Sequence, residues 1–444
     1  MGWEAMMAER MLVWFYVRLF RPIEVFLKPS FKRFLGPNDF IWKGLKRIRS
    51  RLFQNLPSSV TQPDTIPHRI AYPRPDKKKP FGVNLVGTFA SEKGLGEATR
   101  SSARALEAVS IPYVANNFPD ADSANLDTQF QEFDQNNPHS INLIHLNFDI
   151  VPALAQEKGP QFFAGHYNIG CWFWELSEFP EVWYPYFDYF NELWASSNFI
   201  QDCLSRVSPI PVTKMPLTLA PEVSLGSRFS RSYFQIPEDK FVLLFVFDFD
   251  SAIERKNPLG LIEAFTRAFG DSEDVLLYLK SVHGDNHPEA FASIRAATNG
   301  RANIFSANVV YTRGEIDALV HACDCYVSLH RSEGFGLPIA EAMRAAKPVI
   351  VTGYSGNMDF TTSENSFLVD YRLTRIKQEG PYPMGYLWAD PDLDQAAAQM
   401  LSVYKNRDVA AERGRRARET ILKLFDPIVV GARMKERLER IVAM

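Results

Sequence analysis

Short apolar runs alternate along the chain with segments whose apolar residues have helical spacing. An apolar run at 81–87 ends on a glycine, and 98–109 has the helical pattern. Further strand-like runs follow at 111–115 and 141–146. Because such repetition of strand, loop and helix builds a parallel sheet covered by helices, the pattern predicts a first α/β domain.

The pattern pauses at Ser and Pro residues near 222–240 and then starts again. Strand-like runs are predicted at 241–247, 275–279, 308–311, 325–329 and 349–352, and helices at 259–269, 316–322 and 339–346. The sequence therefore predicts two Rossmann-like α/β domains facing a cleft, at 81–222 and 223–425. Ligands of open α/β sheets bind at the carboxyl ends of the strands. Residues 426–444 have the pattern of a final amphipathic helix.

The first 80 residues differ from the rest in charge. They hold sixteen Lys and Arg against six Asp and Glu, although the whole chain of 444 residues has a net charge of −3. Residues 1–55 favour one or two basic amphipathic helices, and the Pro-rich residues 56–80 favour a linker. The apolar run at 11–16 is far shorter than the about 20 residues of a membrane span. We weigh two roles of 1–55 equally: binding an anionic membrane surface, and packing on this protein or on a second subunit.

Composition excludes several classes of protein. With 46% hydrophobic residues the chain is too apolar for wholesale disorder, and its net charge argues against a nucleic-acid partner. The four cysteines lack the paired C-x-x-C spacing of a zinc site. Buried, reduced thiols in a cytoplasmic protein are therefore expected.

The most informative segment for chemistry is 328–343, which reads SLHRSEGFGLPIAEAM. A strand is expected to end near Leu329 and a helix to start at Pro338, so loop amides and a helix N terminus suit a diphosphate. Glu333 lies in the loop, and Glu341 is expected in the first helical turn, where each carboxylate can accept hydrogen bonds from hydroxyls. Taken alone, two glutamates eight residues apart would more often cap a surface helix.

The pattern Glu-x7-Glu within EGFGLPxAEA resembles the donor-site motif of family 4 glycosyltransferases, which are retaining enzymes of the two-Rossmann GT-B fold. The resemblance extends over about residues 81–444. It implies that Glu333 lies beside the transferred sugar, that Glu341 binds the ribose, and that the final helix at 426–444 crosses back to the first domain. The other donor-binding residues that it implies in this loop are Gly334, Phe335, Gly336 and Leu337.

A second segment that resembles the family is 254–258, where Lys256 is implied to hold the donor diphosphate with help from Arg255. The family often has a further arginine just after the preceding strand, but this chain has Asp248 there. That departure leaves the diphosphate site incomplete, and Arg331 is a candidate to complete it.

Two glycine-containing loops also resemble the family. Residues 352–357 correspond to a loop whose amides approach the donor, which implies contacts at Ser355 and Gly356. Gly94 and Gly96 correspond to a loop of the first domain near the donor phosphates and sugar.

The segment 169–180 departs from many family members, which have a histidine at the end of the corresponding strand. This chain has Trp174 and Glu175 there, as one bacterial polysaccharide-synthesis branch does, and Glu175 is a candidate to orient the sugar or the acceptor. In the alternative interpretation Trp172 and Trp174 are core residues and Glu175 caps a helix. His145 closes another strand, but a lone histidine is more often structural.

Asp-x-Asp triplets at 120–122, 248–250 and 390–392 match the metal motif of another transferase fold, but three-residue matches are expected by chance. A phosphate-binding Gly-x4-Gly-Lys-Ser/Thr loop is absent from the sequence, which argues against a kinase or ATPase.

The resemblance therefore implies a retaining, metal-independent glycosyltransferase without a cofactor. It would move a hexose from a nucleotide-diphosphate sugar to a polysaccharide or lipid-linked oligosaccharide, in the cytoplasm or on the inner face of the cell membrane. Two alternatives stay open: a sugar-nucleotide epimerase of the same fold, and a catalytically silent sugar-nucleotide-binding or membrane-scaffold protein.

Overall fold

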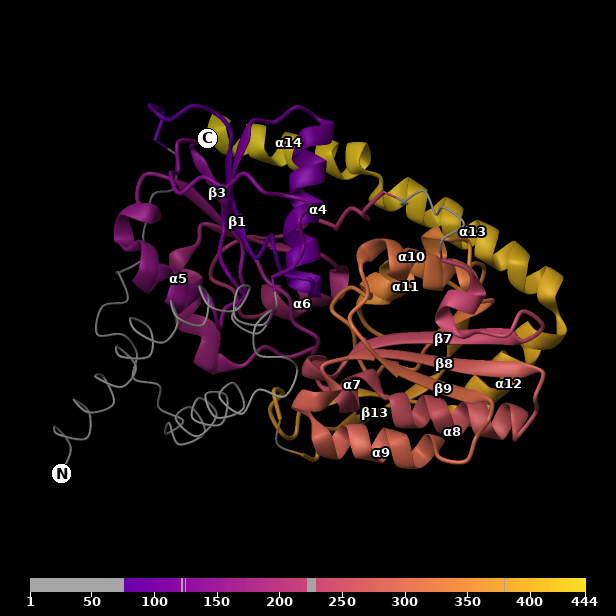
Figure 1. Ribbon diagram of the computed structural model, residues 1–444. Helices are drawn as coiled ribbons and strands as arrows, with labels where there is room; N and C mark the ends of the chain where they lie inside the picture. The colour runs from indigo at the N-terminus through magenta and orange to yellow at the C-terminus, as the bar shows by residue number, and fades with distance from the viewer. Residues whose placement is uncertain (1–75, 121–122, 124, 222–228, 379) are drawn as a thin grey trace, which may run out of the picture.

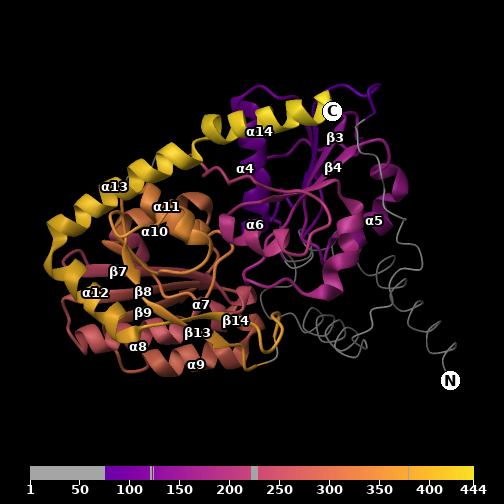
Figure 2. The same ribbon diagram turned by 180° about the vertical axis from the view of Figure 1, so that it is seen from behind.

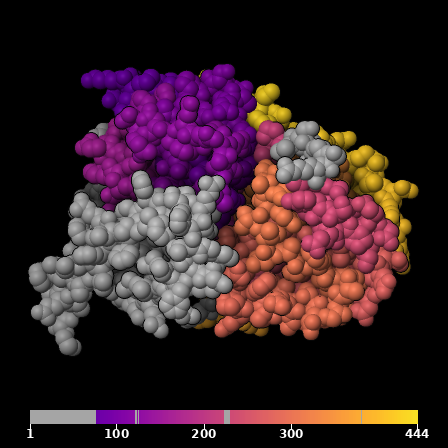
Figure 3. Space-filling view, in the orientation of Figure 1, coloured from indigo at the N-terminus to yellow at the C-terminus, as the bar shows by residue number. Residues whose placement is uncertain are grey.

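The computed structural model describes residues 76–120, 123, 125–221, 229–378 and 380–444. Two α/β domains lie side by side, and the last two helices run along both of them (Figure 1). The space-filling view shows the first domain in indigo to magenta against the second in pink to orange (Figure 3). Residues 1–55, predicted as basic helices, lie outside the described residues. Of the predicted linker at 56–80, only residues 76–80 are described. No helix among the described residues is long and apolar enough to cross a membrane.

The first domain is built on a six-stranded parallel sheet with the strand order β2-β1-β3-β4-β5-β6. Its strands are β1 (Val83–Gly87), β2 (Tyr113–Asn117), β3 (Ile141–His145), β4 (Tyr167–Cys171), β5 (Glu192–Ala195) and β6 (Val212–Lys214). All residues of β1, β3 and β4 are buried, as expected where a parallel sheet is covered on both faces.

The helices of this domain are α4 (Gly94–Ala108), α5 (Val151–Lys158) and α6 (Asn198–Ser205). The sequence pattern predicted a loop before residue 98, but α4 already begins at Gly94. Gly96 packs so tightly that a Cβ there would overlap the carbonyl oxygen of Ser91. Both glycines predicted in a loop therefore belong to the first turn of a helix.

The second domain has its own six-stranded parallel sheet, in the order β12-β11-β10-β7-β8-β9. Its strands are β7 (Phe241–Asp248), β8 (Val275–Val282), β9 (Ile304–Asn308), β10 (Cys325–Ser328), β11 (Val349–Thr352) and β12 (Phe367–Val369). Its helices are α7 (Ile253–Lys256), α8 (Pro258–Phe269), α9 (Pro288–Thr298), α10 (Arg313–Ala322), α11 (Leu337–Arg344) and α12 (Leu393–Lys405). The prediction of two Rossmann-like domains is confirmed.

Short 3₁₀ turns connect several of these elements. They are η2 (Pro160–Phe162), η3 (Glu181–Tyr189), η4 (Arg231–Phe234), η5 (Phe249–Ser251), η6 (Gly284–Asn286) and η7 (Gly356–Asp359).

The last two helices join the domains from outside. Helix α13 (Arg407–Phe425) lies along the second domain, and α14 (Pro427–Ala443) lies beside α4 of the first domain (Figures 1 and 2). A Cβ on Gly431 would overlap the carbonyl oxygen of Ala105, so α14 and α4 are in backbone contact. The chain therefore ends on the domain in which the described part begins.

An antiparallel hairpin of β13 (Tyr371–Arg375) and β14 (Leu387–Pro391) stands apart from both sheets. This hairpin was not predicted from the sequence. Although the hairpin belongs to the second domain, Ile376 and Trp388 pack into the hydrophobic cluster of the first domain, which includes Trp172. The hairpin thus bridges the two domains.

Candidate active site

The loop between β10 and α11, residues 329–336, lies at the carboxyl end of its sheet. Gly336 has a φ of +93°, in the left-handed region, and Pro338 lies in the first turn of α11. No side chain caps the N terminus of α11, so its first N–H groups are open to an anion. Because α11 begins at Leu337, Glu341 lies in the second turn and not in the first turn as expected.

Glu333, Lys256 and Arg255 form a buried triad in which the carboxylate lies between two cations. Glu333 Oε1 is 2.6 Å from Lys256 Nζ, and Oε2 is 3.1 Å from Arg255 Nη1. Burial alone would raise the pKa of Glu333, but Lys256 and Arg255 outweigh it and lower the pKa to about 2. The carboxylate is therefore ionised at neutral pH, and the three predicted residues are brought together.

Backbone hydrogen bonds hold the triad in place. The N–H of Arg331 donates to the carbonyl of Arg255 at 2.7 Å, and Arg255 Nη1 donates to the carbonyl of Ser332 at 2.8 Å. Asn257, with a φ of +57°, ends the single turn of α7 and donates from Nδ2 to the carbonyl of Leu329 at 2.9 Å. The loops that carry the two cations and the carboxylate are thus fixed relative to each other.

The loop after β11 packs directly on the Glu333 loop. The N–H of Glu333 donates to Ser355 Oγ at 2.8 Å, and the N–H of Gly356 donates to the carbonyl of Glu333 at 2.9 Å. A Cβ on Gly356 would overlap the carbonyl oxygen of Gly334. Ser355 and Gly356 therefore lie beside the triad.

Not every residue of the Glu333 loop can offer its side chain to a ligand. Phe335 is buried against Phe360 and Phe425, with ring centroids 5.4 and 5.2 Å away, and Leu337 packs against the same core. At these positions the backbone is the part available to a ligand.

Glu175 of the first domain reaches the same loop. Its Oε2 accepts a hydrogen bond of 2.8 Å from the Tyr382 hydroxyl, and its carbonyl accepts one from Ser332 Oγ. Glu175 lies in the segment between β4 and η3 and caps no helix. Trp172 and Trp174 are buried in the core, so the alternative interpretation holds for the tryptophans but not for Glu175.

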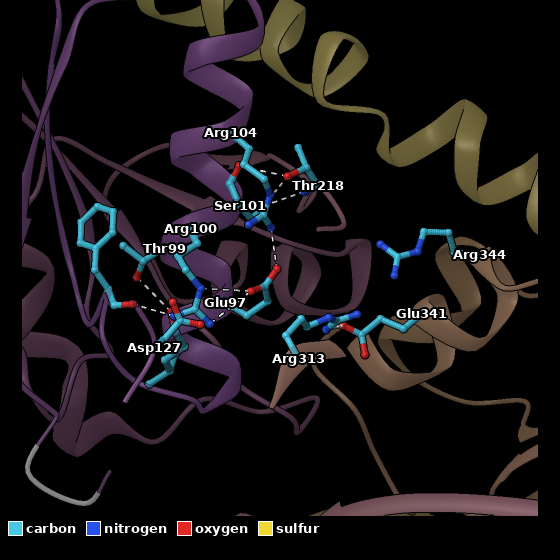
Figure 4. A network of polar contacts seen from close by, with 12 residues as sticks. Glu97, Thr99, Arg100, Ser101, Arg104, Asp127, Thr218, Arg313, Glu341 and Arg344 are labelled. Carbon is cyan, nitrogen blue, oxygen red and sulfur yellow. Dashed lines mark hydrogen bonds and ion pairs between the residues drawn. The ribbon is translucent and has the colours of Figure 1, made fainter. Parts of the chain in front are cut away.

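Glu341 faces the first domain from α11 (Figure 4). Its carboxylate is ion-paired with Arg313 Nη1, and Arg313 Nη2 is 2.5 Å from Asp317 Oδ1. Burial raises the pKa of Glu341, Arg313 opposes that shift, and Glu97 of the first domain adds to it. Arg313 was missed by the sequence analysis, although a cation at the start of a helix is unfavourable to the helix dipole and could have marked it.

A matching network lies on α4, across the domain boundary from Glu341 (Figure 4). Glu97 Oε1 is 2.5 Å from Arg104 Nη2, and Glu97 Oε2 is 3.2 Å from Arg100 Nη2. Arg100 also donates to the carbonyls of Phe89 and Ser91, at 2.6 and 2.8 Å. Gly94 lies at the start of the same helix, and nothing lies within 4 Å of the position that a Cβ would take there.

Arg331 points away from the triad. Its guanidinium donates to the carbonyl of Glu254 at 2.8 Å, is 3.1 Å from Asp390 Oδ1, and lies 5.5 Å from the ring centroid of Trp388. The role proposed for it, completing the diphosphate site, finds no support in this geometry.

Asp248, which stands where the family often has an arginine, is bound to a histidine. Its Oδ1 is 2.7 Å from His283 Nδ1, while Asp250 is 2.8 Å from His287 Nε2 and 3.6 Å from Lys93 Nζ. Ligand atoms of Asp248, Asp250 and His283 lie within 4.8 Å of one another. These groups are satisfied by their own hydrogen bonds and ion pairs.

His145 lies in the interior of the first domain. It is 2% exposed, and its Nε2 is 2.8 Å from Ser102 Oγ. Burial lowers its pKa from 6.5 to about 3, so the imidazole is neutral. This environment agrees with the structural role expected from the sequence.

The second domain and the chain as a whole are similar to known proteins. Residues 227–420 match the family model for glycosyl transferases group 1. Trehalose synthase from Thermococcus litoralis is 21% identical over 322 residues, which cover 67% of this chain and 70% of the relative.

Solved structures show the same fold. Sucrose-phosphate synthase from Thermosynechococcus elongatus is 15% identical, with a TM-score of 0.61 over 82% of this chain and 99% of the other. Anabaena Alr3699/HepE in complex with UDP and glucose is 14% identical, with a TM-score of 0.57 over 81% and 100%. The chain spans 55% of the length of S. aureus TarM. Residues 227–420 are therefore similar to the group 1 glycosyltransferases, and the two domains together have the GT-B fold.

Proposed function

We propose that this protein transfers a hexose from a nucleotide-diphosphate sugar to a glycan acceptor with retention of configuration. The observation that carries the proposal is the buried triad: Glu333, in the loop before the uncapped N terminus of α11, lies between the two cations Lys256 and Arg255 of α7. Cations and helix dipoles of this kind stabilise a departing diphosphate.

In this proposal the donor diphosphate takes Lys256 and Arg255 as partners and releases Glu333. The freed carboxylate then accepts hydrogen bonds from the sugar hydroxyls, and Glu341 accepts them from the ribose. Ser355, Gly356 and the backbone of residues 334–337 line the phosphates. Gly94 and Gly96 approach from the first domain, and Glu175 orients the sugar or the acceptor.

The proposed reaction breaks the bond between the anomeric carbon and the diphosphate oxygen. The acceptor oxygen forms its bond to that carbon on the same face, and the acceptor proton moves to the departing oxygen. Glu333, with a pKa of about 2 in the free protein, does not supply a proton. Because Lys256 and Arg255 already supply positive charge at the diphosphate, the step is proposed to need no metal and no cofactor.

The acceptor is proposed to bind on the first domain, as a growing polysaccharide or a lipid-linked oligosaccharide. Residues 1–55 are proposed to hold the cytoplasmic protein on the inner membrane face. Deleting them should release the protein from anionic liposomes while nucleotide binding stays unchanged. A full-length protein that stays off such liposomes at low salt would contradict the membrane role.

A thermal-shift screen of nucleoside diphosphates and their sugars tests donor binding, because a ligand that binds the native state raises its melting temperature. UDP and UDP-glucose come first, since the Anabaena structure contains UDP and glucose. Radiolabelled donor then separates the alternatives. An epimerase would convert the sugar without acceptor, a silent binder would leave it intact, and a transferase would move the label to the glycan.

A further inference from the structure

A pocket of about 300 Å³ lies beneath the β13–β14 hairpin, outside the triad and the Glu341 network. Figures 1 and 2 both place β13 next to α7, at the edge of the second domain. The volume is at the lower end of the ~300–1,000 Å³ that is typical of sites for small ligands. The side chains that characterise its walls are Glu254, Arg331, Arg375, Lys377, Tyr382 and Trp388.

The pocket carries an excess of positive charge. Arg331 is paired with Asp390 at 3.1 Å. Within the described residues, Arg375 and Lys377 have no carboxylate at ion-pair distance, and the one bond that Arg375 makes is to the carbonyl of Gly385 at 2.7 Å. Among the described residues of the wall, Glu254 is the remaining acid. A ligand with one negative charge would therefore balance the pocket, and an arginine suits a carboxylate or phosphate.

The wall of the pocket also contains two aromatic rings. Tyr382 and Trp388 belong to its wall, and Arg331 holds a fixed position over the Trp388 ring at 5.5 Å. A pyranose ring has apolar C–H faces that pack on aromatic rings, and hydroxyls that bond to charged side chains. Aromatic walls with a few fixed polar groups therefore suit a sugar.

The pocket adjoins the candidate active site. Glu254 and Arg331 line it, while Arg255, the next residue after Glu254, belongs to the triad and donates to the carbonyl of Ser332, the next residue after Arg331. The Tyr382 hydroxyl donates to Glu175 at 2.8 Å, and its ring lies 5.4 Å from that of Trp174. The pocket and the candidate active site are thus joined through Glu254–Arg255 and through Tyr382.

We propose that this pocket of the second domain binds a sugar unit that carries a carboxylate or a phosphate, next to the reacting unit of an acceptor whose main part lies on the first domain. That this sugar is part of an acceptor rests on the proposed function, but binding of an anionic sugar can be measured without a donor. Holding a remote unit there would supply binding energy for positioning the reacting hydroxyl.

Saturation-transfer NMR and calorimetry on the full chain test the site with glucuronic acid, glucose 6-phosphate, glucose and inorganic phosphate. We expect at least one anionic sugar to bind at least tenfold more tightly than glucose, and its identity distinguishes the carboxylate from the phosphate. Phosphate that binds as tightly as glucose 6-phosphate, or glucose that binds as tightly as both anionic sugars, would overturn the proposal.

Variants locate the binding. The double substitution Arg375→Gln and Lys377→Glu should weaken the anionic sugar at least tenfold, whereas Arg372→Gln, on the same strand but outside the pocket wall, should change it less than twofold. Equal effects of the two variants would overturn the proposal. UDP binding should be the same in all variants. If the protein binds the anionic sugar but no nucleotide, the proposal for this pocket is supported and the proposed function is contradicted.

Discussion

At the scale of single residues, the triad must keep its charges balanced. Glu333 is 8% exposed and Lys256 is 9% exposed, so neither charge is solvated by bulk water. Removing one partner of a buried ion pair costs about 3–5 kcal/mol, because the other charge stays buried without compensation. The free protein therefore depends on Glu333 for stability, and a bound diphosphate would replace it in that role.

Glu333→Gln should consequently lower the melting temperature of the free protein and enlarge the stabilisation that UDP provides. The neutral amide leaves Lys256 and Arg255 without a counter-charge, which the diphosphate then supplies. Turnover should fall by about 10²-fold or more, the loss typical of removing one electrostatic stabiliser of a transition state. Differential scanning fluorimetry with and without UDP, together with single-turnover kinetics, measures both effects. Glu289→Gln, on the remote helix α9, is the matched control. A UDP shift no larger than that of the wild type would contradict this role.

His145 gives a prediction for the dependence of stability on pH. In the folded protein its pKa is about 3, whereas in the unfolded chain it is 6.5. Between these values only the unfolded state binds the proton, so the free energy of unfolding falls as the pH falls below 6.5. Acidification from about pH 7 to about pH 5.5 should therefore lower the free energy of unfolding by about 1 kcal/mol through this histidine.

Urea unfolding of the wild type and of His145→Gln at these two pH values measures that contribution. The variant, which cannot titrate at this position, should lose about 1 kcal/mol less on acidification than the wild type. Equal losses in the two proteins would mean that the imidazole takes up a proton in the folded state.

Some residues of the candidate site can be identified from the sequence, whereas others become apparent only from contacts in the structure. Lys256, Glu333 and Glu341 were identifiable because the resemblance rests on local patterns. Arg313 and Tyr382 were not, because they meet Glu341 and Glu175 from 28 and 207 positions away in the chain. Arg331 stands two residues before Glu333 but points away, since strand β14 and Glu254 hold its guanidinium.

At the scale of elements, the two glycines at the N terminus of α4 differ: Gly96 is tightly packed, whereas the space beside Gly94 is open to a ligand. A Cβ at Gly96 would overlap the carbonyl of Ser91, whereas nothing lies within 4 Å of a Cβ at Gly94. Gly96→Ala should therefore lower the melting temperature. Gly94→Ala should keep it or raise it, since alanine favours a helix over glycine by up to about 1 kcal/mol.

If α4 approaches the donor as proposed, Gly94→Ala should also weaken nucleotide-sugar binding, because the new methyl group occupies the open space at the helix start. Calorimetric titration with the donor sugar nucleotide measures this, and scanning fluorimetry measures the stability of both variants. Gly94→Ala with unchanged donor affinity would remove that residue from the donor site.

The elements that the sequence predicted well are those buried in the two sheets. The apolar run at 308–311 was predicted as a strand, but β9 is Ile304–Asn308 and Val310 is 58% exposed. Apolar content alone did not show which residues pair with β8. The β13–β14 hairpin was missed because its first strand is largely exposed, with Leu373 52% exposed, and gives no pattern of a buried face.

At the scale of the whole molecule, a few polar contacts hold the two domains together around the candidate site. Ser197 Oγ of the first domain donates to the carbonyl of Gly334 at 2.6 Å. Asp359 of the second domain is 2.7 Å from Lys214 Nζ and accepts from the N–H of Asn198 at 3.0 Å. Because these contacts lie beside the Glu333 loop, we expect that a donor reaches the triad only when the domains separate and close again.

Asp359→Asn should therefore favour a more open arrangement, since the amide keeps an acceptor for Asn198 but loses the charge that attracts Lys214. When less of the protein is in the binding-competent form, the apparent affinity for the donor falls by that fraction while the saturated rate is retained. We expect a larger radius of gyration by small-angle X-ray scattering without ligand, a higher KM for the donor, and an unchanged kcat. Lys214→Gln should reproduce these changes, and Asp239→Asn, an exposed position outside the boundary, should not. If Asp359→Asn leaves both the radius of gyration and KM at their wild-type values, the two domains are held by contacts other than this one.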